Sequence, residues 1–245
     1  MRKVPLVDTD IIEFSTLQSP CVYIKGKQMK MAYKYIKECS LSLSSKLIQR
    51  GWRRFGHYYS APECSDCDAC QSMRISVDDF IFSKSVRRVI KKNSATRILV
   101  RKPTVSQDHL NLYEKYHRYM EEKKGWEYYP LTAESYADLY GKGHSSYGYE
   151  ILYIRDEKLI GVDLVDFLED GISAIYFYYD PDYAHLSLGK FSLYKQIEMA
   201  RERELSWIYL GYYVKECDSL NYKADFKPNQ ILRNNPTLEE EPLWR

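Results

Sequence analysis

One run in the second half of the chain restricts the possible folds more than any other feature. The segment YEILYIRDEKLIGVDLVDFLEDGISAIYFYYDPD, residues 149–182, contains three apolar stretches separated by RDEK and LEDG. Short polar segments containing Gly or Asp between such stretches are typical of tight turns, so the run predicts three antiparallel strands. LSLGKFSLYKQIEMARERE, residues 186–204, then predicts a helix, and LSWIYLGYYV, residues 205–214, predicts a strand. The predicted order is β-β-β-α-β.

This order resembles the core of the GNAT acyltransferases, in which two central strands diverge and leave a slot for an activated ester. A backbone N–H in such a slot can polarise the acyl carbonyl. Members that use coenzyme A carry a glycine-rich loop that binds pyrophosphate at a helix N-terminus. The corresponding stretch YAHLSLGKF has the single glycine Gly189. We therefore expect no coenzyme A and a donor carried on a larger polyanion.

Three closely spaced cysteines precede this region. Cys64, Cys67 and Cys70 lie in PECSDCDACQSMRI, residues 62–75. This spacing suits ligands of one metal centre better than it suits disulfides, and free reduced thiols remain the alternative. The start MRKVPLVDTD shows no signal peptide, and no apolar run approaches the ~20 residues of a membrane span. We expect a cytoplasmic protein with no membrane partner, a setting in which clustered cysteines more often bind metal.

Positive charge is concentrated between the cysteines and the GNAT-like region. Residues 46–102 contain thirteen Lys or Arg and five acidic residues, although the net charge of the whole chain is only +2. SKSVRRVIKKN predicts a helix with Ser83 as its N-cap. Five basic residues recur at helical spacing and predict one positive stripe: Lys84, Arg87, Arg88, Lys91 and Lys92. Such a stripe is either a solvated face or, as we favour, a surface for the phosphates of a nucleic acid.

Five segments together resemble the bacterial aminoacyl-tRNA–protein transferases, the leucyltransferases related to arginyltransferases. These segments are PCVYIKGK (20–27), LIQRGWRRFGHYYSAPECSDCDACQSMRI (47–75), FSKSVRRVIKKN (82–93), LVDFLEDGISAIYFYYDPDYAHLSLGKFSLYKQI (164–197) and WIYLGYYVKECDSLNYKADFKP (207–228). The resemblance implies transfer of leucine from Leu-tRNA to an N-terminal Asp or Glu, which marks the acceptor protein for degradation. It also places Cys21 near the cysteine cluster as a fourth ligand, for zinc or an iron–sulfur cluster.

The predicted fold class is α+β, with a GNAT-like core at residues 105–245. The N-terminal domain, residues 1–104, carries the cysteine cluster and the basic helix. We expect the slot to form from YFYYD (176–180) and YLGYY (209–213), with Gly211 permitting close approach of the acceptor backbone. Candidate catalytic residues are Asp166, Tyr178, Asp180, Gly211 and Tyr212, with the two aspartates orienting the amine or taking its proton. The alternative for Gly211 is that it only forms a bulge.

An acidic acceptor needs a cation in the slot, because a buried carboxylate without a partner is costly. The candidates are Arg53, Arg54, Arg74 and Lys223, some of which can contact tRNA instead. Two alternatives stay open at this point: an arginyltransferase with the same acceptors, and a non-catalytic metal-binding RNA module. A coenzyme A acetyltransferase is opposed by the missing pyrophosphate loop.

Overall fold

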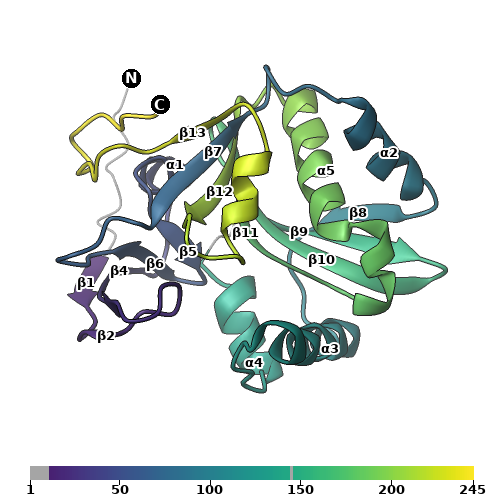
Figure 1. The fold of residues 1–245 in the computed structure, drawn as a ribbon, viewed down its shortest axis with the longest axis horizontal. Helices are drawn as coiled ribbons and strands as arrows, with labels where there is room; N and C mark the ends of the chain where they lie inside the picture. The colour runs from purple at the N-terminus through teal and green to yellow at the C-terminus, as the bar shows by residue number, and fades with distance from the viewer. Residues whose placement is uncertain (1–10, 144–145) are drawn as a thin grey trace, which may run out of the picture.

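The computed structural model describes residues 11–143 and 146–245, which form a mixed α and β fold around one large sheet (Figure 1). From one edge to the other, its seven strands are β13 (Asn229–Ile231), β7 (Gln71–Ser76), β12 (Trp207–Tyr213), β11 (Gly171–Tyr179), β10 (Lys158–Phe167), β9 (Gly148–Arg155) and β8 (Arg97–Arg101). Strands β9, β10 and β11 form the predicted antiparallel meander. The RDEK turn is confirmed, with Asp156 and Glu157 at positive φ.

Helices cover both faces of this sheet. Helices α2 (Lys84–Lys92) and α5 (Leu188–Glu202) lie on one face, and α3 (Gln107–Lys124) and α4 (Ala133–Tyr136) lie on the other (Figure 1). A π-helical turn, η1 (Ala137–Gly141), follows α4, and short 3₁₀ segments are η2 (Pro181–Leu186) and η3 (Asn221–Asp225). None of the helices in the described part of the chain has the length and apolar character needed to cross a membrane.

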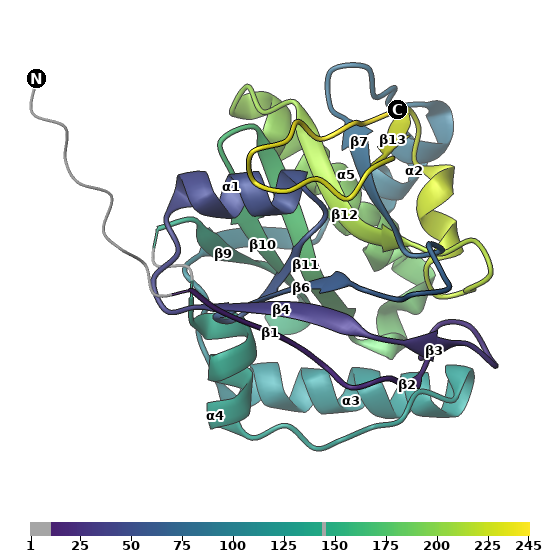
Figure 2. The same ribbon diagram turned by 90° about the vertical axis from the view of Figure 1, so that its left-hand side faces the viewer.

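A second sheet packs beside the first one. Its strands, in order, are β1 (Ile11–Ser15), β4 (Met31–Ile36), β6 (Tyr58–Pro62) and β5 (Arg53–Phe55). A small ribbon joins β2 (Ser19–Pro20) to β3 (Gln28–Met29). In Figure 2, α1 (Leu41–Gln49) lies on one side of β4 and β6, and α3 lies on the other side. Helix α1 ends at Gln49 with Arg50 as its C-cap, and Gly51 follows with a φ of +87°.

The large sheet crosses the predicted domain division. Strands β7 and β8 both precede residue 104, yet β7 pairs with β12 and β13, and β8 pairs with β9. A cut at residue 104 therefore does not separate two structural units. Hydrogen bonding explains this arrangement, because β7 satisfies its backbone groups on both edges only with strands from the C-terminal part.

Strands β11 and β12 diverge after a short paired segment, which creates the slot. They pair in parallel over Gly171–Ser173 and Trp207–Tyr209, and β11 then continues to Tyr179 without β12. Each strand also carries a bulge at the point of divergence, Ile175 in β11 and Leu210 in β12. A bulge bends its strand and increases its twist, so the two bulges help to open the slot.

One buried ion pair joins the two sheets. Arg54 of β5 donates from Nε and Nη2 to the two carboxylate oxygens of Asp166 in β10, at 2.6 and 2.8 Å. Arg54 also donates to the backbone oxygens of Gly56 and Lys142. Both side chains are buried, with exposures of 2% and 0%. This bidentate geometry places the two sheets in one fixed orientation.

We expect Asp166→Asn to destabilise the protein by about 3–5 kcal/mol, because it leaves a buried guanidinium without its counter-charge. The matched control is Glu114→Gln, which breaks the exposed Arg118–Glu114 pair on α3 and should cost no more than ~0.5 kcal/mol. Urea unfolding of both variants measures the difference. A loss below ~1 kcal/mol in Asp166→Asn would contradict the role given to the pair.

Candidate active site

Arg53 enters the slot between β11 and β12. Arg53 and Arg54 are neighbours on β5, and successive side chains of a strand point to opposite faces. Nη2 of Arg53 donates to the bulged Ile175 carbonyl of β11 at 3.0 Å. Its Cζ lies 5.5 Å from the ring centre of Tyr212 and 5.7 Å from that of Phe55. One cation thus contacts both diverging strands.

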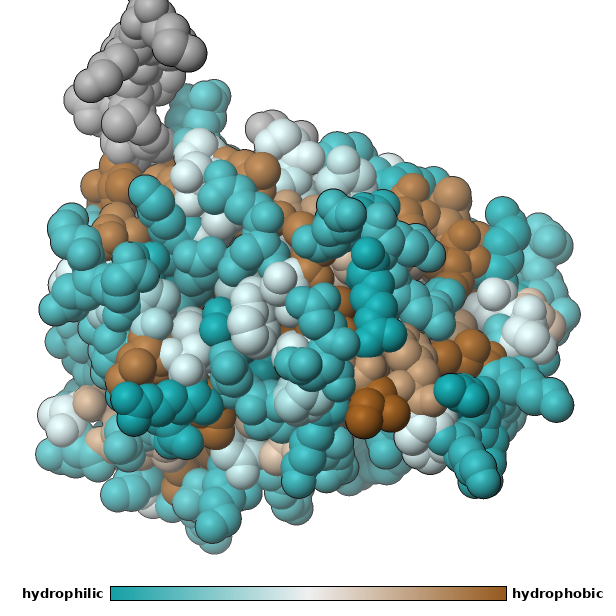
Figure 3. All heavy atoms as spheres, turned by 90° about the horizontal axis from the view of Figure 1, so that it is seen from above, coloured by the Kyte–Doolittle hydropathy of each residue, from teal (hydrophilic) through white to brown (hydrophobic). Residues whose placement is uncertain are grey.

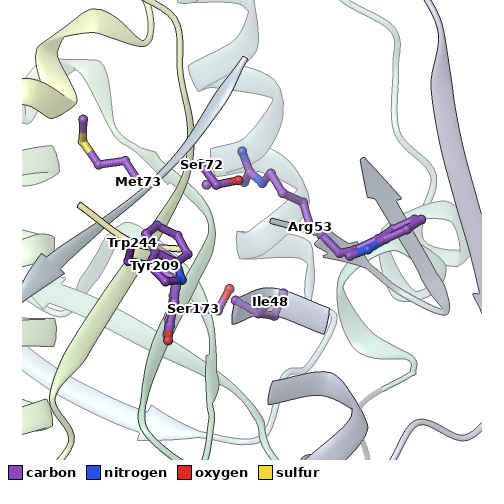
Figure 4. Close-up of a pocket in the computed structure, with 10 residues that line it drawn as sticks. Ile48, Arg53, Ser72, Met73, Ser173, Tyr209 and Trp244 are labelled. Carbon is purple, nitrogen blue, oxygen red and sulfur yellow. The ribbon is translucent and has the colours of Figure 1, made fainter. Parts of the chain in front are cut away.

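A small cavity adjoins this guanidinium. Figure 4 shows Tyr209, Trp244 and Ser173 on one side of the cavity and Arg53 on the other side. Its volume is about 10 Å³, which is close to the space that a single water molecule requires. Because Arg53 lines this cavity, a substrate group entering here would contact its side chain.

Gly211 makes room for Arg53. It has φ +70° and follows the bulge of β12. A Cβ at this position would lie 2.6 Å from Cζ of Arg53. The sequence left open whether Gly211 forms a bulge or permits close approach, and the structure shows both features. The group that approaches here is the Arg53 side chain.

Lys223 binds the backbone of β12 on either side of Gly211. Its Nζ donates to the carbonyls of Leu210 and Tyr212, at 2.9 and 2.6 Å, and its side chain is buried. Burial, and after it the nearby Arg53 cation, hold the pKa of the Lys223 ammonium well below its usual value. Lys223 therefore holds the backbone of β12 near Arg53, which binds the Ile175 carbonyl of β11.

Other predicted site residues are bound to partners away from the slot. Asp180 forms ion pairs with Lys115 and Lys158, at 2.6 and 2.7 Å. The Tyr178 hydroxyl lies 2.7 Å from the Tyr136 hydroxyl within the aromatic core beneath α3. These contacts, together with the Arg54–Asp166 pair, place the four predicted residues in structural contacts away from Arg53.

Arg74 also lies outside the slot. Its guanidinium stacks between Trp207 and Trp244, with Cζ 3.5 and 4.5 Å from the two ring centres. It donates to Oε1 of Gln230, at 2.9 Å from Nε and 2.7 Å from Nη2. Burial lowers the pKa of Arg74, although the neighbouring Tyr209 opposes this effect. Arg74 therefore fastens the C-terminal segment onto the sheet.

The predicted basic helix is confirmed as α2, with the Ser83 hydroxyl accepting from the Val86 N–H. All five basic side chains are exposed: Lys84, Arg87, Arg88, Lys91 and Lys92. Within the described residues, none of the five forms an ion pair. Figure 3 shows the molecule from above the view of Figure 1. This face is mainly hydrophilic, with hydrophobic residues in separate patches. The exposed charges of α2 remain free for a polyanion.

The predicted metal ligands Cys21, Cys64, Cys67 and Cys70 line one large cavity. Burial raises the pKa of the Cys70 thiol to about 12, with smaller contributions from the other three thiols and from Cys217. Cys217, which we did not predict as a ligand, therefore lies near the cluster. Across residues 11–143 and 146–245, however, no three Cys, His, Asp or Glu side chains converge as a metal site.

Sequence reasoning missed several residues that shape this region. Trp52 and Trp244 line the small cavity beside Arg53, and Trp52 lies under the Lys34 ammonium. Trp52 directly precedes Arg53 in the segment 47–75, which carries the family resemblance. Its place beside a predicted site residue could therefore have indicated that it lies near the site. Trp244 is brought in by the C-terminal segment, where its Nε1 donates to the Gln49 carbonyl. No local pattern indicates that long-range contact.

We expect Gly211→Ala to displace Arg53 and to destabilise the protein more than a positive φ alone explains. The matched control is Gly125→Ala, since Gly125 has φ +67° and no atom within 4 Å of its added Cβ. The control should cost ~1–2 kcal/mol, and Gly211→Ala should cost at least ~1 kcal/mol more. Adding Arg53→Ala should recover that excess in a double-mutant cycle of urea unfolding. Equal losses in the two glycine variants would refute the predicted clash.

Two family models match the sequence of this chain. "Arginine-tRNA-protein transferase, N terminus" matches residues 19–88, and "Arginine-tRNA-protein transferase, C terminus" matches residues 108–233. Among solved structures, FemX is similar with a TM-score of 0.44 and 9% identity, covering 70% of this chain and 55% of that one.

Curated relatives are much closer in sequence. The aspartate/glutamate leucyltransferase of Campylobacter jejuni subsp. jejuni serotype O:6 is 52% identical over 234 residues, covering 95% of this chain and 98% of the relative. The one of Helicobacter hepaticus is 45% identical over 234 residues, with coverage of 96% and 97%. At these identities over nearly the full length of both chains, the chain belongs to the aspartate/glutamate leucyltransferase family.

Proposed function

We propose that this protein transfers leucine from Leu-tRNA to the α-amine of proteins that begin with Asp or Glu. The observation that carries this proposal is the Arg53 cation, held between the diverging strands β11 and β12. A GNAT-like slot accommodates an acyl ester, and a cation at its mouth suits an acidic acceptor. Family membership supports the same activity. By this activity the protein marks its acceptors for degradation.

The proposed transfer reaction does not require a strong general base. The aminoacyl ester of a tRNA is already activated, and an α-amine has a pKa of ~7.7–8.0, so part of it is neutral near pH 7. The amine attacks the ester carbonyl, and the tetrahedral oxyanion collapses with cleavage of the ester C–O bond. The departing 3′ oxygen of the tRNA takes up the proton that the amine loses and becomes a hydroxyl. The enzyme has to hold the two groups together and stabilise the oxyanion. We place this step beside the backbone of Ile175, where the β11 bulge interrupts pairing with β10.

Arg53 is our choice for the acceptor carboxylate. Among the four predicted cations, Arg54 is paired with Asp166, and Arg74 is stacked between two tryptophans. Lys223 is buried against backbone carbonyls, and its pKa is lowered. Arg53 makes a single hydrogen bond, to the Ile175 carbonyl, within the described residues. Its remaining N–H groups can bind a carboxylate in bidentate fashion.

The exposed cations of α2 complete the proposal as contacts for tRNA phosphates. Figure 1 places α2 beyond α5 as seen from the second sheet, so α2 and the slot lie on different parts of the molecule. A ligand that reaches both has to be large, which suits a tRNA better than a small acyl donor.

The test measures kcat/KM with labelled Leu-tRNA for peptides beginning with Asp, Glu, Asn and Gln. We expect the wild type to prefer Asp over Asn, and Arg53→Met to lose about tenfold or more of this preference, since a hydrogen bond to a charged group contributes ~1.5–3 kcal/mol. Arg53→Lys should keep part of the preference, and Arg118→Met, on the exposed face of α3, should keep all of it. A parallel assay with Arg-tRNA decides between leucine and arginine.

Three results would count against parts of this proposal. Absence of transfer from either aminoacyl-tRNA would defeat the transferase activity. Equal use of Asp and Asn peptides by the wild type would defeat the acidic acceptor. A full preference in Arg53→Met would remove only the role of Arg53.

The four predicted cysteines also support a structural metal centre, holding zinc or an iron–sulfur cluster. Four thiols in one cavity are a suitable donor set, but their side chains have to turn toward a common point. Such a centre would fix the β2–β3 ribbon against the segment before β7. Because these ligands bind as thiolates, the raised pKa of Cys70 would have to fall on metal binding.

We expect near-stoichiometric zinc or iron in anaerobically purified protein, measured by metal analysis and visible absorption. Cys67→Ser should lose most of it, whereas Cys39→Ser should keep it, since Cys39 is buried in a separate cluster beside α1. Neither metal in the wild type, or equal content in both variants, would overturn the metal centre.

A further inference from the structure

One face of the second sheet carries an aromatic surface that the slot does not use. Residues directly opposite each other on paired strands share a face. The first row across the sheet consists of Phe14, Tyr33, Ser60 and Arg53. The second row consists of Ile12, Tyr35, Tyr58 and Phe55. We call Phe14, Tyr33, Tyr35 and Tyr58 the aromatic face.

The rings of the aromatic face form a continuous contact chain. Phe14 stacks on Tyr33 with ring centres 5.3 Å apart, and Tyr58 lies 6.5 Å from Tyr33 and 5.2 Å from Tyr35. Phe14 and Tyr58 are 46% and 44% exposed. Neighbouring Ile12 is 59% exposed. Large apolar groups left open to water in this arrangement mark a binding surface.

The polar groups of this face are also available. Within residues 11–143 and 146–245, the hydroxyls of Tyr33, Tyr35 and Tyr58 have no hydrogen-bond partner. The two rows contain no acidic residue, because Glu13 lies on the opposite face and pairs with Lys34. The only charged side chain in the rows is Arg53. The face thus offers flat rings, free hydroxyls and a positive end.

The aromatic face leads directly into the slot. Its first row ends at Arg53, which contacts β11 through the Ile175 carbonyl. The Tyr212 hydroxyl of β12 donates to the Ser60 carbonyl at 2.9 Å, so β12 contacts the middle of the same sheet. A ligand lying across the rings therefore has one end at the position where the ester has to react.

We propose that the aromatic face stacks the unpaired 3′-terminal bases of the aminoacyl-tRNA and guides its ester into the slot. This inference rests on the proposed transfer from tRNA. Bases stack on aromatic side chains, and tyrosine hydroxyls can donate to phosphate or ribose oxygens. The acceptor peptide is the competing occupant, but its acidic side chain needs a cation, and the face carries one only at its inner end.

The test compares binding of two RNA hairpins that share an acceptor-type stem, one blunt and one with a single-stranded 3′ CCA overhang. Wild type should prefer the overhang hairpin. Tyr33→Leu and Tyr58→Leu should each reduce that preference about five- to hundredfold, because each removes a stacking ring. Tyr33→Phe and Tyr58→Phe retain the ring and should retain most of the preference. Tyr129→Leu is the control, since Tyr129 is 68% exposed and lies outside the face.

Salt dependence separates this surface from α2. Arg87→Gln with Arg88→Gln should weaken both hairpins equally and reduce the salt slope by about two if both residues contact phosphates. The leucine variants should lower affinity for the overhang hairpin at every salt concentration and leave the slope unchanged.

Two outcomes would overturn the inference. One is an unchanged overhang preference in both leucine variants, with thermal unfolding showing that they are folded. The other is a raised KM for the Asp-peptide together with an unchanged overhang preference, which would identify the face as an acceptor surface. A wild type that binds the overhang hairpin but transfers no leucine would instead defeat only the proposed activity.

Discussion

The buried pair between Arg54 and Asp166 fixes the relation of the two sheets, and the slot depends on that relation. Arg53 directly precedes Arg54 on the same strand, so its side chain points to the opposite face, toward β11 and β12. Two adjacent arginines therefore divide two tasks. One neutralises a buried carboxylate in the core, and the other lies between β11 and β12, where we propose that it binds the acceptor carboxylate. An error in strand register by one residue would exchange these positions.

The parts of the fold that the sequence predicted well are those that local pattern controls. The β9–β10–β11 meander, α5, β12 and the capped helix α2 each follow from apolar spacing and turn residues. Strands β1 and β4 were not predicted, although MAYKYI in β4 is rich in apolar and aromatic residues. Their pairing depends on one another and on β6, and a single segment gives no sign of such partners.

The candidate site was predictable in its segments but not in its contacts. Arg53, Gly211, Tyr212 and Lys223 were predicted site residues and do meet at the slot. Arg54 was predicted to bind the acceptor and Asp166 to orient its amine. The sequence did not indicate that these two residues, more than a hundred positions apart in the chain, bind each other. Many tyrosines are core residues beneath α3, whereas others form the exposed aromatic face.

The position of β7 has a consequence for how the protein is made. This strand lies between β12 and β13, which are synthesised more than a hundred residues later. During translation both of its edges lack partners, and an unpaired strand edge is a template for intermolecular association. The N-terminal half of a nascent chain therefore cannot reach its final structure on the ribosome ahead of the C-terminal half. Protection by a chaperone that binds extended segments is expected to matter most during this interval.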